Sequence, residues 1–489
     1  MRRGRNTKLV DLFALTGWSK GELARLVNRR AAGMGHPQLA TDTSRVRRWL
    51  EDGECPRDPV PRVLAALFTE RLGRVVTSED LGLTGRPRHH VPAVPEELPW
   101  STKRTVDALT EFTGMDLMLN RRGFVGTGFA LVAGPVLVTN FDRWLGTGKP
   151  GPGAAASTAV PRANAFGTTR AVYAPIDAGP VGSEEVAALE HAVTVFRAWD
   201  ANRGGGLQRK AVVGQLNEVG NLLTADNPGP VKQRLWAVAA NLSVLAGWMS
   251  HDVGLNPTAQ NYFVIGAHAA REAGDLPRAA EALSRAARQM VHLGRARDAL
   301  ALIELAQRTA GERATPTTRA MFHTVEAWAQ AALGQSAECR RTLGLAEREF
   351  TRAQPQEDPD WIGFFDSADL HGMQALVYRT LADSDPSAVR PAQEHAQKAM
   401  ELRAQGHQRS QTFDLISLAS AYLLDGQADA GAQYARLAIR STREVSSHRT
   451  WDRLGDMQKL TGRYKDVPEI RSLHEEISEG GGPTGPTTA

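Results

Sequence analysis

Three arginines fall within four positions of one short stretch, TDTSRVRRWL (residues 41–50), directly after the small hydroxyl residues Thr43 and Ser44. Guanidinium groups are strong donors to phosphate oxygens and to the guanine edge in the DNA major groove. A helix that enters this groove needs short side chains at its N-terminal end, which Thr43 and Ser44 provide. The stretch therefore predicts a surface for a polyanion. The alternative is an ordinary amphipathic helix with a solvated face.

The charge of the chain supports the first reading. Residues 1–90 hold 17 Lys and Arg against 10 Asp and Glu, whereas the remaining residues hold 41 against 44. The basic excess of this 489-residue chain thus lies wholly at its beginning. A small basic domain on a mildly acidic body is typical of a head that binds a polyanion. A solvated basic terminus is the competing interpretation.

Helical patterns in the first 85 residues would position the arginines. Ser19 and Glu22 form a capping-box spelling, and Asp42 can cap the helix that carries Arg45. The spacing predicts four short helices and assigns these residues to their buried faces: Leu9, Leu12, Phe13 and Leu15 before Gly17; Leu23, Leu26 and Val27; Val46, Trp49 and Leu50; Val63, Leu64, Leu67 and Phe68.

The segment WSKGELARLVNRR…TDTSRVRRWLEDGECPR resembles the Cro/CI-type helix-turn-helix, with Leu23-Ala24, the V-x-x-W of Val46 and Trp49, then Gly53 and Pro56. Residues 31–41 make a longer connection than the usual three or four residues. The resemblance implies double-stranded DNA as the partner. The candidate DNA-binding residues are Lys20, Thr43, Ser44, Arg45, Arg47 and Arg48.

Residues 86–182 have the composition of a linker region. It is proline-rich at first, has a partly ordered middle at residues 100–145, and is low in complexity and flexible at residues 146–161. The uncharged stretch 123–141 is long enough to span a bilayer, but its glycines, Pro135 and polar residues favour a buried segment. The GTGK of residues 146–149 lacks the Ser/Thr of a P-loop, and His89-His90 is more simply polar sequence than a metal site.

Residues 183–478 are helical by pattern and repetitive, and residues 479–489 form a disordered tail. Small residues such as Ala286, Ala287, Ala299 and Ala306 recur around presumed turns at Gly294, Gly334, Gly426 and Gly462. These units resemble tetratricopeptide repeats. The expected fold is all-α: a helix-turn-helix domain at residues 1–85, followed by an α-solenoid. Such an array offers a groove for a peptide, small-molecule or protein partner.

The segment FRAWDANRGGGLQRKAVVGQLNEVGNLL (residues 196–223), with Gly204, Gly205 and Gly206 expected to make a helix–helix turn, adds a second resemblance. Together with residues 41–83 it is similar to actinobacterial regulators of differentiation and antibiotic production. This resemblance implies a transcription regulator, repressive in development or secondary metabolism, in the cytoplasm on the nucleoid.

The residues that catalysis requires do not form a motif. The sequence contains no HExxH and no complete P-loop, and Cys55 and Cys339 cannot form a CxxC pair. His251-Asp252 is expected to be a helix-end pair. We therefore expect no enzyme, no cofactor, no metal and no membrane span. The alternative function is an interaction scaffold that does not bind DNA. The sequence also leaves open whether the protein forms a homodimer.

Overall fold

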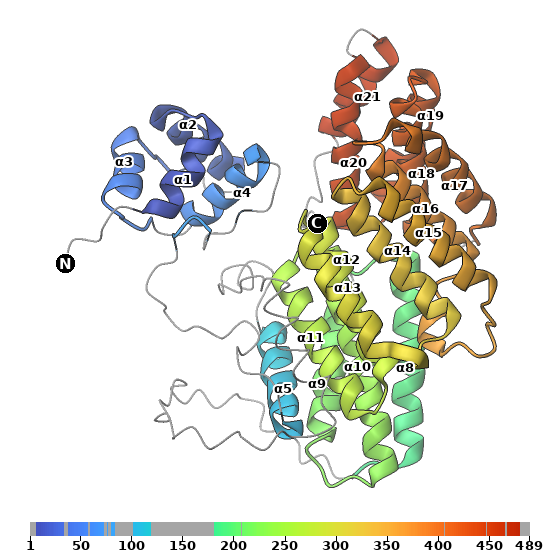
Figure 1. Ribbon diagram of the computed structural model, residues 1–489. Coiled ribbons are helices and arrows are strands. Elements are labelled where there is room, and N and C mark those ends of the chain that lie inside the picture. Colours follow the sequence, from blue (N-terminus) through green and yellow to red (C-terminus); the bar gives the residue numbers. More distant parts are fainter. Residues whose placement is uncertain are drawn as a thin grey trace. The chain divides into compact units, whose positions relative to one another are not determined.

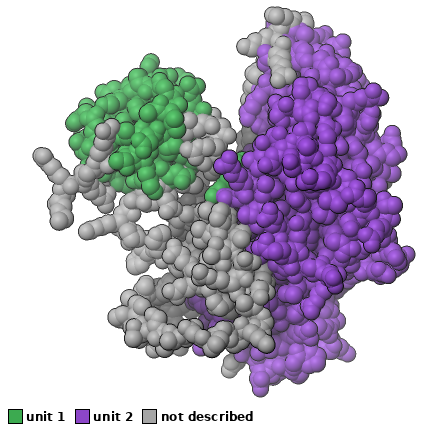
Figure 2. All heavy atoms as spheres, viewed as in Figure 1, with its two compact units in different colours: residues 1–93, 293–295 green, residues 94–292, 296–489 purple. Residues whose placement is uncertain are grey.

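The computed structural model describes residues 6–33, 38–56, 59–72, 76, 80–83, 101–118, 180–206, 208–404, 406–445, 447–464 and 467–479. Over these residues the chain is all-α and contains no strand. It divides into two compact units, residues 1–93 with 293–295 and residues 94–292 with 296–489 (Figure 2). Each unit has its own buried core. The stretches at residues 123–141 and 146–161, and His89-His90, lie outside the described residues.

The described part of the first unit forms α1 (Thr7–Thr16), α2 (Lys20–Gly33), α3 (Thr43–Glu51) and α4 (Val60–Leu72). Its core joins apolar residues of all four. Gly17 ends α1 in the left-handed conformation at φ 70°. The backbone N–H of Glu22 donates to Ser19 Oγ at 3.1 Å, which is the first half of the expected capping box. The all-α head expected from the spacing is confirmed, although Leu15 is exposed and Phe13 half-buried.

The second unit is built from helices that pack in consecutive pairs (Figure 1). Its helices are α5 (Thr102–Met118), α8 (Ser183–Arg203), α9 (Arg209–Leu222), α10 (Gly229–Asp252), α11 (Asn256–Glu272), α12 (Leu276–His292), α13 (Ala296–Ala310), α14 (Pro316–Ala332), α15 (Ser336–Thr351), α16 (Ser367–Leu381), α17 (Val389–Leu402), α18 (Gln408–Leu424), α19 (Ala428–Glu444), α20 (His448–Thr461) and α21 (Pro468–Glu479). The architecture is a helical-repeat solenoid, as the sequence predicts.

Glycines make the sharp turns within the pairs. Gly294, Gly334 and Gly426 have φ of 74°, 72° and 81°, a backbone conformation that side chains with a Cβ disfavour. Gly462 differs from this expectation, since its φ of −59° is right-handed and α20 continues into a short 3₁₀ turn. The glycines at 204–206 join α8 to α9. A Cβ on Gly205 would lie 2.5 Å from Met249 Cα, so only glycine allows this close approach to α10.

Helix α5 lies in the middle of the region expected to link head and body, and it packs against α9 and α11. Asp116 near its end accepts two hydrogen bonds from the Arg209 guanidinium, at 2.6 and 2.7 Å, and one from the Tyr262 hydroxyl at 2.6 Å. All three groups are buried. Residues 102–118 are therefore part of the core of the second unit.

Candidate nucleic-acid interface

Helix α3 is held in the head by one apolar face. Val46, Trp49 and Leu50 are at most 3% exposed and pack in the core with α1, α2 and α4. Asp42 caps the helix as predicted, since its carboxylate accepts the Arg45 N–H at 2.8 Å. Fixing one face in this way leaves the opposite face of a nine-residue helix entirely outside the core.

The chain leading into α3 is anchored by Asn28 of α2. The Asn28 side chain donates to the Thr41 carbonyl at 2.9 Å and accepts the Thr41 N–H at 2.7 Å. The long connection thus ends in a fixed position relative to α2, one residue before the cap. Sequence reasoning missed this role of Asn28, because a side-chain amide 13 positions upstream has no recognisable spacing.

The exposed face of α3 carries the candidate donors. Thr43, Ser44, Arg45, Arg47 and Arg48 are all exposed, and the Arg45 guanidinium donates to the Ala40 carbonyl at 2.9 Å. Residues three and four apart lie side by side on a helix, so Ser44 neighbours Arg47 and Arg48. The short hydroxyl residues of the first turn and the arginines behind them thus lie together on the exposed side of one helix.

Acidic residues at the C-terminal end of α3 partly neutralise this surface. Arg47 lies 3.7 Å from Glu51 and Arg48 lies 3.1 Å from Glu54, while Lys20 of α2 forms an ion pair with Glu51. The side chains of Lys20, Arg47 and Arg48 are 42%, 52% and 45% exposed, and ion pairs at such exposure contribute about 0–1 kcal/mol. A phosphate can therefore displace these acids at little cost.

A second polar centre lies in the solenoid at Asp252, the last residue of α10. This fully buried carboxylate contacts Arg409 of α18 at 2.5 Å and Arg449 of α20 at 2.5 Å, and it accepts a hydrogen bond from Ser447 at 3.0 Å. Burial alone would raise the pKa of Asp252, but the two guanidinium groups outweigh it and hold the pKa well below its usual range. Asp252, which the sequence predicts to form a helix-end pair with His251, thus connects the beginning of the array with its end.

Asp252 and its partners close the inner layer of the solenoid. Helices α10, α12, α14, α16, α18 and α20 each pack against the next, and α20 returns to α10. Arg409 also pairs with Asp200 of α8 at 2.9 Å, and His292 of α12 lies 3.2 Å from Asp452 of α20. The inner face therefore surrounds a central space instead of forming an open trough.

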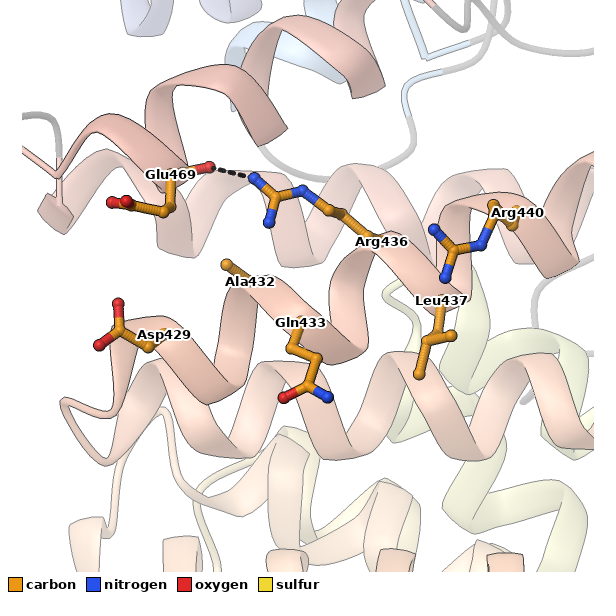
Figure 3. Close-up of a pocket in the computed structure, with 7 residues that line it drawn as sticks. All are labelled: Asp429, Ala432, Gln433, Arg436, Leu437, Arg440 and Glu469. Atoms are coloured by element: carbon orange, nitrogen blue, oxygen red, sulfur yellow. Dashed lines mark hydrogen bonds between the residues drawn. The ribbon is translucent and has the colours of Figure 1, made fainter.

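A shallow cavity of about 430 Å³ lies on the outer helices α19 and α21 (Figure 3). Arg436 and Arg440 project from α19, and the Arg436 guanidinium donates to the Glu469 carbonyl at 3.3 Å. Asp429 also lines the cavity, so its charges are mixed and favour no ligand class.

No group of three or more His, Cys, Asp or Glu in the described ranges could hold a metal ion. Among the described helices, none is both long and apolar enough to span a membrane.

The geometry defines two units, a helical head with an exposed basic helix and an all-α repeat body. The family model of the SP15 N-terminal domain matches residues 9–84, which is the head alone. No curated protein matches the chain.

Proposed function

We propose that the protein is a transcription regulator that binds double-stranded DNA through α3. The observation that carries this proposal is the division of α3 into a face fixed by Val46, Trp49 and Leu50 and an exposed face with Ser44 and three arginines. A recognition helix needs both properties, because its position must be rigid while its donors reach base edges and phosphates. Lys20 and Thr43 complete the proposed interface.

The body is proposed to bind a partner or ligand and to set the regulatory state. A ligand that favours one curvature of the array can shift its population only by its differential affinity for the two states. The resemblance of residues 41–83 and 196–223 to actinobacterial regulators favours repression of developmental or secondary-metabolism genes. A homodimer would place two heads on neighbouring half-sites.

A salt-dependent mobility-shift titration of the full chain with genomic promoter fragments tests DNA binding. If three to four cationic side chains neutralise phosphates, log K should fall with log salt at a slope of about −3 to −4. No shift at low salt would contradict the proposal. It would favour the alternative, an interaction scaffold in which Glu51 and Glu54 permanently neutralise the arginines.

Coupling between head and body needs a second measurement. Operator affinities of residues 1–85, 1–182 and 1–489 in one buffer, at matched oligomeric state, should differ if the body sets the state of the head. A ligand of the body should then change operator affinity, and DNA should change ligand affinity by the same factor. Identical affinities, unchanged by cell extract, would leave the body as a recruitment arm.

A further inference from the structure

The central space of the solenoid contains a cavity of about 390 Å³ between α12, α14, α16, α18 and α20. Its lining includes His292, Trp328, Arg379, Ser417 and Arg453. Lys459, Asp456 and Asp383 also line it and are exposed, so the cavity is reached from solvent along this rim. A volume of this size suits a small molecule.

A narrow recess of about 40 Å³ adjoins the cavity and shares Leu376, Ser417 and Arg453 with it. Arg288 of α12 also lines the recess, whereas Arg453 belongs to α20. The recess therefore brings together two guanidinium groups that are 165 positions apart in the sequence, with the Ser417 hydroxyl beside them.

Arg288 and Arg453 lack polar partners. Neither guanidinium makes a hydrogen bond or an ion pair with any residue that the structure describes. Each is held by aromatic rings instead: Arg288 lies over Trp248 at 5.3 Å, and Arg453 over Phe413 at 4.6 Å and Trp328 at 5.5 Å. These cation–π contacts hold the guanidinium groups beside the rings and do not use their N–H donors as hydrogen-bond donors to the described residues. An anion would supply the acceptors that the described protein residues do not provide to these donors.

Neighbouring acidic residues do not neutralise the positive charge of Arg288 and Arg453. Arg379 pairs with Asp383, and Lys459 pairs with Asp456, so the rim is balanced. Asp369 and Asp414 also line the recess, but both are bound by Arg403, at 2.9 and 3.0 Å.

The pKa shifts affect both signs of charge in the recess, since burial and the neighbouring Arg285 also lower the pKa of Arg288 well below its ordinary value. Burial raises the pKa of Asp369 and raises that of Asp414 to about 7, so neither holds its negative charge as firmly as an ordinary carboxylate. Burial and the neighbouring Arg449 lower the pKa of Arg453 to about 9, at which the group still carries its charge at neutral pH.

We propose that this cavity binds a small anionic molecule whose phosphate or carboxylate group lies between Arg288 and Arg453. Arg–oxyanion pairs are short and often bidentate, and Ser417 can add a further donor. The ring closed by Asp252 leaves no open trough for an extended peptide, which favours a small ligand. This inference deepens the proposed ligand binding of the body and does not depend on DNA binding by the head.

The test measures binding of pyrophosphate and of citrate to the full chain by calorimetry, with chloride at matched ionic strength as the reference. We expect saturable binding of at least one probe. Preference for pyrophosphate would identify the anion as phosphate, and preference for citrate would identify it as carboxylate. Arg288→Gln and Arg453→Gln should each weaken binding at least tenfold. Arg453→Lys, which keeps the charge but loses the planar donor pair, should weaken it less.

Arg390→Gln is the matched control, because it removes the same charge from an exposed position on α17. It should bind like the wild type. Both cavity variants lose their contacts with aromatic rings, so their melting without ligand is measured as well, and the binding comparison uses them at a temperature where they are folded. Binding of neither probe, or equal binding by all variants, would overturn the proposal. The same variants should still shift DNA, so a protein that binds the probes but not DNA would refute only the proposed function.

Discussion

The two sets of arginines in this chain differ in what holds them. On α3, Arg47 and Arg48 are about half exposed, and each lies beside a carboxylate of its own helix end. In the central cavity, Arg288 and Arg453 are half-buried and stacked on aromatic rings, with no acidic partner among the described residues. The first arrangement gives mobile charges that suit a long, regular polyanion. The second gives fixed donors that suit one small anion.

The difference also affects stability. Exposed pairs such as Arg47–Glu51 are screened by water and salt, so removing one partner changes little. The Asp252 carboxylate is fully buried between two guanidinium groups, where an unpaired charge is expensive. The head should therefore tolerate changes of its charged residues, whereas the body should not.

The largest effect is expected for Asp252→Asn. Removing one partner of a buried pair costs about 3–5 kcal/mol. Here Arg449 loses its carboxylate partner, whereas Arg409 keeps its ion pair with Asp200, so the loss should lie within this range. Calorimetric unfolding of the full chain should show an earlier transition of the body. Glu394→Gln, which breaks the exposed pair with Arg390, is the control and should shift it by less than about 1 kcal/mol. Equal shifts would show that burial does not distinguish the two pairs.

Trp49→Ala should destabilise the head alone. The indole is 3% exposed in the core of the head, and truncation of a buried aromatic costs about 3–5 kcal/mol. The tryptophan fluorescence of the head reports this change poorly, so amide hydrogen exchange of residues 6–83 is the better measurement. Protection should fall throughout the head and stay unchanged in the body. Unchanged protection of α3 would show that Trp49 does not anchor it.

Smaller effects are expected for Arg45→Ala and Arg48→Ala. Each should leave the melting temperature nearly unchanged and weaken operator binding by about 1–3 kcal/mol if the guanidinium contacts guanine in two places. Specificity should then relax at one base pair. Mobility shifts and thermal unfolding of the same samples would separate the two roles, with Arg390→Ala as the charge-matched control. Loss of stability equal to that of Trp49→Ala would make these arginines structural.

Local features of the fold were predictable from the sequence. Asp42 as a cap, the buried side of α3 and the turns at Gly294, Gly334 and Gly426 all depend on residues a few positions apart. The exposed positions of the arginines of α3 were predicted from the same local pattern.

Long-range polar contacts were not predictable. Asp116–Arg209 and Asp252–Arg409 join residues 93 and 157 positions apart, and single charged residues on helices have no spacing that reveals such partners. The anion cavity was missed for the same reason, since Arg288 and Arg453 belong to different repeats. The packing of α5 into the body was not predicted either, because it depends on the long-range contacts of Asp116 with Arg209 and Tyr262.

The smallest expected effect is the pH dependence of the stability of the body that Asp414, which lines the recess, produces. Burial and, to a smaller extent, the nearby Asp369 raise the pKa of Asp414 to about 7. Arg403 and Arg453 lower this pKa but do not outweigh burial. The folded protein then binds more protons than the unfolded chain between the ordinary carboxylate pKa and about 7. The stability of the body should therefore fall as pH rises through this window.

Asp414→Asn should remove this slope, and it should make anion binding less dependent on pH, because the neutral amide resembles the protonated acid. Buried histidines such as His251, whose pKa is lowered by burial, act in the opposite direction in both proteins. The difference between wild type and Asp414→Asn therefore isolates the carboxylate. Chemical denaturation at pH 5 to 8 measures it, and parallel curves for the two proteins would show that Asp414 does not titrate in this range, so that the cavity keeps its full negative charge beside Arg288 and Arg453.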